Sequence, residues 1–167
     1  RAQNLGLIPF GGASALTPGN NFCAGTEPGE PNVDACPVVS SLTCDESVWY
    51  TFTTNGSPGL TTIAITGTVG INAHIDVYLN APGGGCNFNN LYQIASRDDL
   101  LSNNVSVSIP CLLPNRQYYV QVDGVDVLGD NGTFNIQVSD NGIFTSAPAN
   151  DAMCSAVALG NPNGGAV

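Results

Sequence analysis

The sequence predicts an all-β domain, a two-sheet β-sandwich of jelly-roll or Greek-key type, with extended N-terminal and C-terminal segments. Apolar and polar residues alternate with period two in a series of short segments, and turn-forming residues separate these segments. No window carries the i, i+3, i+4 apolar stripe of an amphipathic helix together with capping residues. Because a single open sheet would leave one apolar face in water, we expect two sheets packed face to face.

The alternation runs from Val48 to Val138. Each expected strand places a set of apolar residues on one of its own faces: Val48, Tyr50 and Phe52; Ile63 and Ile65 within 60–67; Ile75, Val77 and Leu79 within 72–80; Val105, Val107 and Ile109; Tyr118, Val120 and Val122; and Phe134, Ile136 and Val138. A weaker strand is expected at 91–96. Turn signals lie between them at 55–59, 81–85, 113–115 and 130–132. Since Trp49 and Tyr50 are neighbours, their side chains point to opposite faces, and only one of them can lie deep in the core.

A short segment near the start of the chain recurs near its end. Residues 20–24 (NNFCA) are matched, with one residue inserted, by residues 150–156 (NDAMCSA), and a proline-containing connector precedes each copy. We interpret this as one complete module followed by the beginning of another, with chance similarity as the alternative. The expected organisation is an extended segment or linker at 1–19, the β-sandwich domain at 20–142, and a connector with the start of a further repeat, or an exchanged segment, at 143–167.

The charge and cysteine content limit the classes of function. There is no lysine, and three arginines oppose 13 acidic residues, which gives a formal net charge of −10. This excess argues against binding to nucleic acid or to an anionic membrane surface, and no apolar run is long enough to insert into a bilayer. Six cysteines without a CxxC motif, beside a single histidine, are typical of disulfides rather than of a zinc or haem site. We expect an extracellular or cell-surface protein whose secretion signal has been removed.

All six cysteines are disulfide candidates. Cys86 and Cys111 are the preferred pair, because both lie at strand ends beyond the central strands. Among the first three, Cys44 is expected to pair with Cys23 or with Cys36. The cysteine left over then needs Cys154, either within the chain or, if Cys154 opens another module, in a neighbouring subunit. The sequence leaves this choice open.

Four motifs stand out along the chain, in this order: Asn20 to Cys23, Cys44 to Phe52, Tyr118 to Gly124 and Gly132 to Val138. In this order they resemble the motifs of a family of bacterial surface modules that is common in secreted proteins of Bacteroidota type and related to the pre-peptidase C-terminal β-sandwich domain. The resemblance covers about residues 20–140 and implies a surface or adhesin repeat module with a β-sandwich fold. Related modules often carry a cysteine pair around the segment that is 96–99 here, whereas this chain places Cys111 later, so the family's connectivity is not carried over.

Two kinds of candidate site lie in the expected loops. Sequons begin at Asn55, Asn104 and Asn131, in or beside turns that could accommodate a glycan, although a chain rich in Asn, Ser and Thr also produces such triplets by chance. Acidic loops could hold Ca²⁺ through oxygen ligands from Asp123, Asp126 and Asp130. These loops lack the ordered spacing of an EF-hand, and solvated turn aspartates are the alternative. Apart from this candidate Ca²⁺ and covalent glycans, no cofactor is expected.

The sequence gives little support to catalysis. His74 is the only histidine, and no Gly-x-Ser-x-Gly elbow, P-loop or dinucleotide fingerprint accompanies it. Because His74 precedes Ile75 in an expected strand, we predict that it is a surface or partly packed residue. The chain is therefore not expected to be an enzyme.

The two tails carry candidate assembly residues. Leu5, Leu7 and Phe10 in the first tail, and Val157 and Leu159 in the last, could form edge strands in this domain or in a neighbouring copy, while ordinary linkers are the alternative. A head-to-tail joint that does not close into a ring yields a filament. The leading hypothesis is thus a structural subunit or tandem-repeat module of an extracellular fibre or adhesin, glycosylated if the sequons are used, with copies of itself as partners.

The alternative hypothesis is a carbohydrate-binding or matrix-binding accessory module of a larger secreted protein. Exposed aromatic side chains would then line one face of the sandwich. Tyr78, Tyr92 and Tyr119 are the candidates, with cross-strand packing as their other explanation.

Overall fold

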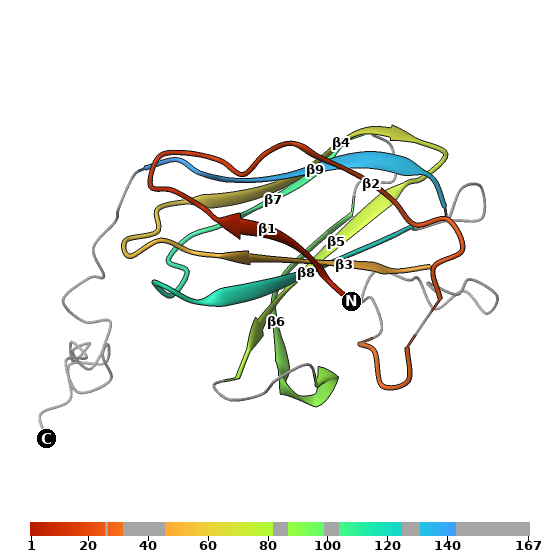
Figure 1. The fold of residues 1–167 in the computed structure, drawn as a ribbon, viewed down its shortest axis with the longest axis horizontal. Coiled ribbons are helices and arrows are strands. Elements are labelled where there is room, and N and C mark those ends of the chain that lie inside the picture. The colour runs from red at the N-terminus through yellow and green to blue at the C-terminus, as the bar shows by residue number, and fades with distance from the viewer. Residues whose placement is uncertain (26, 32–45, 82–86, 99–103, 125–130, 143–167) are drawn as a thin grey trace, which may run out of the picture.

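The computed structural model describes residues 1–25, 27–31, 46–81, 87–98, 104–124 and 131–142. In this part of the chain, the strands form two packed sheets (Figure 1). The first is five-stranded, with the order β1 (Gln3–Leu7), β3 (Val48–Thr53), β8 (Gln117–Gly124), β5 (Ala73–Asn80) and β6 (Leu91–Asp98). The second is four-stranded, with the order β2 (Thr17–Asn20), β9 (Thr133–Asp140), β4 (Thr61–Val69) and β7 (Val105–Ile109). The predicted all-β sandwich is confirmed.

The strand pairing is nested. β2 pairs with β9, β3 with β8, β4 with β7 and β5 with β6, and all four pairs are antiparallel. This pattern arises when one long antiparallel hairpin, closed at the β5–β6 connection, is rolled up so that its strand pairs alternate between two sheets. Rolling brings β4 beside β9 and β5 beside β8, which completes the sheets. The topology is therefore that of a jelly roll.

The inward-facing side chains of both sheets form one core. In β3, Tyr50 and Phe52 point inward, while Trp49 points outward, as their adjacency requires. Tyr50 meets the Phe134 ring of the opposite sheet edge-on, with 6.2 Å between the centroids, and Phe52 stacks on Tyr118. Most of the other fully buried core residues come from the predicted alternation, and Ile8 is an addition from the first tail: Ile63, Ile65, Ile75, Val77, Val120, Val122, Ile136, Val138 and Ile8.

The first 20 residues belong to the sandwich, which corrects the expected domain start at residue 20. β1 pairs in parallel with β3, and β2 pairs with β9, so this segment runs along the edges of both sheets. Gly6 has a φ of 90° at an irregularity in β1, and the chain turns there. As a result Leu5 and Ile8 pack on the core, whereas Leu7 is 63% exposed. The first tail is thus an edge strand of its own domain.

Candidate functional site

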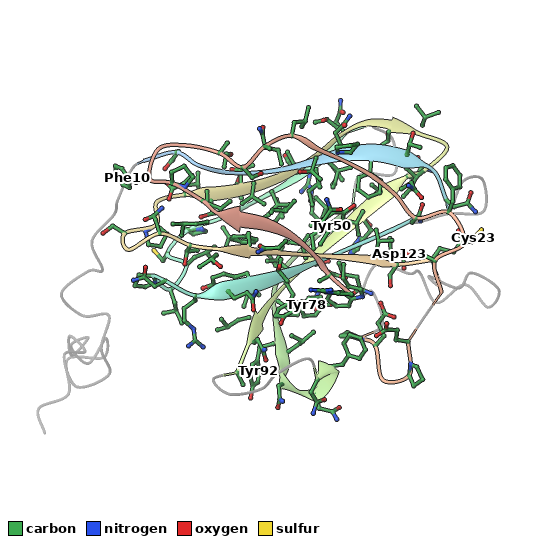
Figure 2. All side chains as sticks on the ribbon, viewed as in Figure 1. Phe10, Cys23, Tyr50, Tyr78, Tyr92 and Asp123 are labelled. Carbon is green, nitrogen blue, oxygen red and sulfur yellow. The ribbon has the colours of Figure 1, made fainter. Side chains whose placement is uncertain are left out.

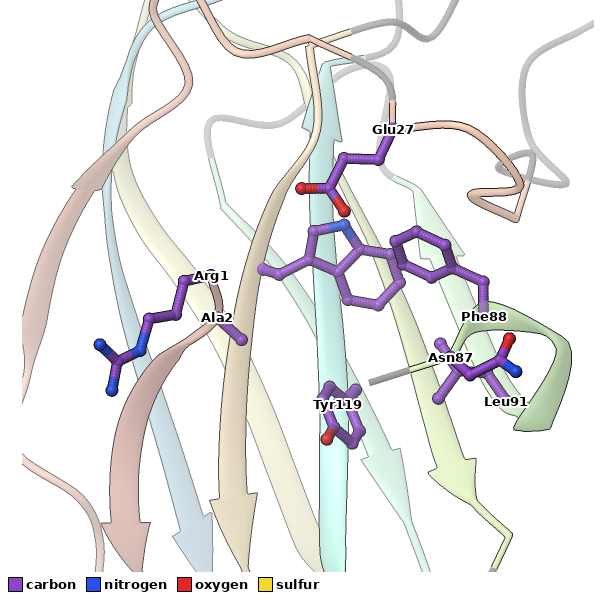
Figure 3. Close-up of a pocket in the computed structure, with 8 residues that line it drawn as sticks. Arg1, Ala2, Glu27, Asn87, Phe88, Leu91 and Tyr119 are labelled. Carbon is purple, nitrogen blue, oxygen red and sulfur yellow. The ribbon is translucent and has the colours of Figure 1, made fainter. Parts of the chain in front are cut away.

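A pocket lined by aromatic side chains lies on the outer face of the five-stranded sheet (Figure 3). We call it the Trp49 pocket. Its volume is about 130 Å³, and its lining consists of Arg1, Ala2, Glu27, Trp49, Asn87, Phe88, Leu91 and Tyr119. The rings of Trp49, Phe88 and Tyr119 and the side chains of Ala2 and Leu91 supply apolar groups, and Glu27, Asn87 and Arg1 supply polar groups. Concave apolar sites with a few polar groups are the usual form of small-ligand pockets.

Local structure explains why the three rings meet. Trp49 in β3 and Tyr119 in β8 alternate with core residues, so both point outward. Phe88 comes from the short 3₁₀ turn η1 (Phe88–Asn90), where the Asn87 side chain accepts a hydrogen bond from the Asn89 backbone N–H. This turn places the Phe88 ring 5.5 Å from the Trp49 ring, centroid to centroid, at an interplanar angle of 39°.

A polar network fixes the Trp49 side chain. The indole Nε1 donates to Glu30 Oε1 at 2.6 Å, and Gln121 Nε2 donates to the same oxygen at 3.1 Å. The Ser47 hydroxyl is a third donor to this oxygen. Gln121 in turn accepts from the Tyr78 hydroxyl at 3.0 Å. Because these polar groups satisfy one another, they hold the indole in one orientation.

The three tyrosines proposed as a binding face do not lie together. Tyr78 is only 2% exposed and packs against Trp49 at 5.6 Å, so it supports the pocket from below and corrects the expectation that it is exposed. Tyr92 is 63% exposed, but it pairs with Leu79, whose side chain packs on the core, so Tyr92 belongs to the other face of the sheet. Only Tyr119 lines the pocket. Phe88 lies outside the alternating segments, and nothing in the sequence pointed to it.

A larger and more polar groove adjoins the Trp49 pocket between β1, β2 and β3. Its volume is about 390 Å³, and it shares Arg1, Glu27 and Trp49 with the pocket. The groove reaches Tyr50, and burial raises the pKa of the Tyr50 hydroxyl to about 12.

His74 is buried, which corrects its expected surface or partly packed position. It is 1% exposed on the outer face of β5, with Nε2 at 3.1 Å from Asp76 Oδ2 and 3.2 Å from Ser96 Oγ. In a Ser-His-Asp relay the hydroxyl and the carboxylate engage opposite ring nitrogens. Here both contacts converge on the same nitrogen, so the cluster does not have the geometry of that relay.

The Asn55 side chain is a structural joint. Its Nδ2 donates to the Ile8 carbonyl at 3.2 Å and to Asp140 Oδ2 at 2.8 Å, and its Oδ1 accepts from the Ser57 N–H. Nδ2 is also the atom that an N-linked glycan would modify. The other two predicted sequon residues, Asn104 and Asn131, are exposed. Asn104 Oδ1 accepts from the Gly67 N–H at 3.1 Å. Glycosylation of either residue stays a prediction.

Asp140 completes this joint and is held as a carboxylate. Burial acts to raise its pKa, but hydrogen bonds from the N–H groups of Gly142 and Gly59, from the Asn55 amide and from Gly11 outweigh burial and hold the pKa of Asp140 below its usual value. Oδ1 accepts from Gly142 at 2.7 Å and Oδ2 from Gly59 at 3.1 Å. The joint therefore ties the end of β9 to the turn that follows β3.

The remaining predicted site residues are only partly described. Asp123 is buried in β8, while Asp126 and Asp130 lie outside the described residues, and no group of three metal-binding side chains occurs within those residues. Cys23 and Cys111 are exposed. The other four cysteines and two assembly residues also lie outside the described ranges: Cys36, Cys44, Cys86, Cys154, Val157 and Leu159. The calcium site and the disulfide connectivity thus stay predictions.

The fold and the pocket define a jelly-roll β-sandwich with a small hollow, partly lined by aromatic rings, on the outer face of one sheet. No protein-family model and no curated protein sequence matches the chain. Along the described part of the chain, no helix is both long enough and apolar enough to cross a bilayer.

Three solved structures are similar to the chain. One is the pre-peptidase C-terminal domain of a collagenase from Bacillus anthracis, with 16% identity, 83% of this chain and 95% of that chain covered, and a TM-score of 0.48. Another is PliG of Aeromonas hydrophila, a periplasmic inhibitor of g-type lysozyme, with 16% identity, coverages of 83% and 98%, and a TM-score of 0.40. The third is CorA of Methylomicrobium album BG8, a surface-associated copper-binding protein, with 11% identity, coverages of 84% and 100%, and a TM-score of 0.46. These scores are too low to carry any function over to this chain.

Proposed function

We propose that the chain is a non-catalytic structural module of an extracellular fibre or adhesin, in which successive copies join head to tail through their terminal segments. The supporting observation is the direction of the outer strands. β1 begins at the level of Tyr50, near the start of β3, whereas β9 ends at Asp140, which is bonded to Asn55 just beyond the end of β3. The described chain thus enters toward one end of the sandwich and leaves at the other, an arrangement that suits a linear series of modules.

The first strand is also suited to exchange between copies. β1 and the residue after it contribute Leu5 and Ile8 to the core, and the Ile8 N–H donates to the Thr53 carbonyl at 2.9 Å. A terminal strand that completes a core makes the same bonds whether its own chain or a neighbouring chain supplies it. Glycans at the exposed Asn104 and Asn131 would then coat the fibre.

Electron microscopy of the native material tests the fibre, and a disulfide trap tests the strand. Asn4 and Thr51 are register partners in the β1–β3 pair, so the double variant Asn4→Cys, Thr51→Cys places two thiols at adjacent positions. If β1 comes from a neighbour, oxidation gives a covalent ladder that Asn4→Cys alone does not give. Regular filaments are expected, and discrete monomeric particles at every concentration would contradict the proposal.

A second function is favoured by the Trp49 pocket, namely binding of a carbohydrate or a matrix component by an accessory module. The pocket is preformed, because Glu30 holds the Trp49 indole and Asn87 fixes the turn that carries Phe88. Tyr119 is the best residue to change, since it lines the pocket but takes no part in the Glu30 network.

Glycan-array and calorimetric binding by the full chain tests this second function. Tyr119→Ala is expected to weaken binding at least about tenfold, the size of effect usual for an aromatic contact residue. Tyr92→Ala is the matched control, because it removes an exposed tyrosine from the other face of the sheet. Equal binding by the parent and Tyr119→Ala would rule out the pocket as the site.

A further inference from the structure

Large apolar side chains are exposed at both ends of the sandwich. One group, which we call the Phe10 cap, consists of Leu7, Phe10, Leu60 and Leu113, which are 63%, 55%, 37% and 49% exposed. The other, which we call the Phe22 cap, consists of Phe22 and Val69, which are 53% and 70% exposed. Figure 2 labels Phe10 and Cys23, the neighbour of Phe22, at opposite ends of the long axis.

The Phe10 cap is built on the Asn55–Asp140 joint. Asn55 bonds the Ile8 carbonyl between Leu7 and Phe10, and the Phe10 ring lies beside Gly142. The Leu60 N–H donates to Asn141 Oδ1 at 3.0 Å, and the Asn141 N–H donates to the Leu60 carbonyl at 3.1 Å. The Leu113 carbonyl accepts from the Thr54 hydroxyl at 2.7 Å. Four loops are thus held together by hydrogen bonds, so the backbone beneath the apolar side chains is already ordered. Covering these side chains therefore costs little conformational entropy.

Hydrogen bonds also hold the backbone beneath the Phe22 cap. Asn21 is fully buried beside Phe22, where its Oδ1 accepts from the Gly132 N–H at 2.8 Å and its Nδ2 donates to the Glu46 carbonyl at 2.9 Å. Val69 and Asn20 both pair with Thr133, so the two sides of the cap flank the start of β9. The two caps therefore have different residues and lie at opposite ends, as the two halves of a heterologous contact do.

We propose that the Phe10 cap of one copy docks on the Phe22 cap of the next copy. This inference rests on the proposed fibre and names the surfaces that its copies share. The path of the chain favours a second copy as the occupant: the described chain leaves the domain at Gly142, beside the Phe10 ring, and 25 residues (143–167) continue from there. A copy joined through this segment, as in the proposed fibre, would be tethered next to the cap that it covers. Contact between two apolar caps also suits a chain of net charge −10, since copies that repel one another need a joint without like charges.

Two double variants and one matched control test the joint. Phe10→Ser with Leu113→Ser alters the first cap, and Phe22→Ser with Val69→Ser alters the second. Tyr92→Ser with Ile94→Ser removes two apolar side chains that are likewise exposed, 63% and 37%, but lie on β6. Circular dichroism melts establish that each variant is folded, and sedimentation velocity over a concentration series measures self-association.

The parent and the β6 control are expected to form chains, and each cap variant is expected to associate at least about tenfold more weakly. A mixture of the two cap variants should then form dimers and no longer species, because each pair has one intact joint. If the parent forms chains and the cap variants associate equally well, or if the mixture gives no dimer, the cap-to-cap joint is wrong and the fibre proposal stands. If the parent stays monomeric at every concentration, the fibre proposal itself fails.

Discussion

The Asn55 joint yields the sharpest prediction about stability. Replacing Asn55 by alanine removes three hydrogen bonds: one to a backbone carbonyl, at 3.2 Å, one to the Asp140 carboxylate, at 2.8 Å, and an exposed one from the Ser57 N–H, at 2.7 Å, which water can replace. A neutral bond contributes about 0.5–1.5 kcal/mol and a bond to a charged group about 1.5–3 kcal/mol. Asn55→Ala is therefore expected to lower the free energy of unfolding by about 2–4 kcal/mol.

Urea unfolding, followed by the fluorescence of the single tryptophan, Trp49, measures this change. The control is Ser57→Ala, which destroys the same sequon while leaving every Asn55 side-chain bond in place, because Ser57 contributes only its backbone N–H. It is expected to stay within about 0.5 kcal/mol of the parent. The reasoning is refuted if Asn55→Ala also stays within that range, or if Ser57→Ala costs as much, since the effect would then come from a lost glycan.

Three further predictions concern packing and pH. Gly132→Ala should lower the free energy of unfolding by more than about 3 kcal/mol or prevent folding, because a Cβ there would lie 2.1 Å from the backbone oxygen of Val69. Gly56→Ala is the control, since a Cβ at Gly56 meets nothing nearer than 3.9 Å. If Gly132→Ala melts at the temperature of the parent, the prediction is wrong. Burial raises the pKa of Tyr50, so its stabilisation is intact below pH 10 and is removed as the pH rises toward 12, by about 1–2 kcal/mol because Tyr50 borders a groove. Because burial also raises the pKa of Tyr118, Tyr50→Phe should reduce this alkaline dependence rather than abolish it, and an unchanged dependence in denaturation across that range would contradict the role of Tyr50. Because the pKa of Asp140 is lowered in the folded state, its stabilisation is intact above the ordinary pKa and is lost as the pH falls through the folded-state value. Asp140→Asn should therefore flatten the acid limb of the curve of unfolding free energy against pH. An unchanged acid limb would exclude this role.

The sequence predicts the fold well where structure is set by local alternation. The segments around Phe52, Ile75 and Ile136 read as half-buried strands because each alternates with period two, and all three are strands with those residues in the core. The sandwich followed from the need to cover two apolar faces. The nested pairing did not follow, because the strand pattern leaves the order of neighbours open.

The segments that the sequence placed wrongly depend on tertiary contacts. β2 (Thr17–Asn20) contains Pro18 and Gly19 and has no alternation, yet it pairs with β9. Gly19 permits this close approach because it has no Cβ, and a Cβ there would fall where the Tyr50 hydroxyl and the Phe134 ring lie. His74 is buried because Asp76 and Ser96 surround it from two strands. The contacts of Gly19 with Tyr50 and Phe134, and of His74 with Ser96, join residues that are distant in sequence and cannot be read from a local pattern.

In the candidate site, too, local alternation predicts some residues and tertiary contacts decide the others. The outward direction of Trp49 could be deduced from its place beside Tyr50. Phe88, which lines the pocket, and Glu30, which holds the Trp49 indole, come from connecting segments that the strand pattern does not cover. The sequence therefore pointed to Trp49 and Tyr119, whereas the residues from the connecting segments were found only in the structure.

The rolled-hairpin arrangement has a consequence for synthesis of the chain. β5 and β6 are close in sequence and can pair as soon as both have left the ribosome, but each further pair outward joins segments that lie progressively further apart. Contacts between distant segments cost more chain entropy and form slowly. β2 must wait for β9, the last strand of the described residues, so β2 is made early and paired late. During that interval β2 is free to find a partner other than its own domain.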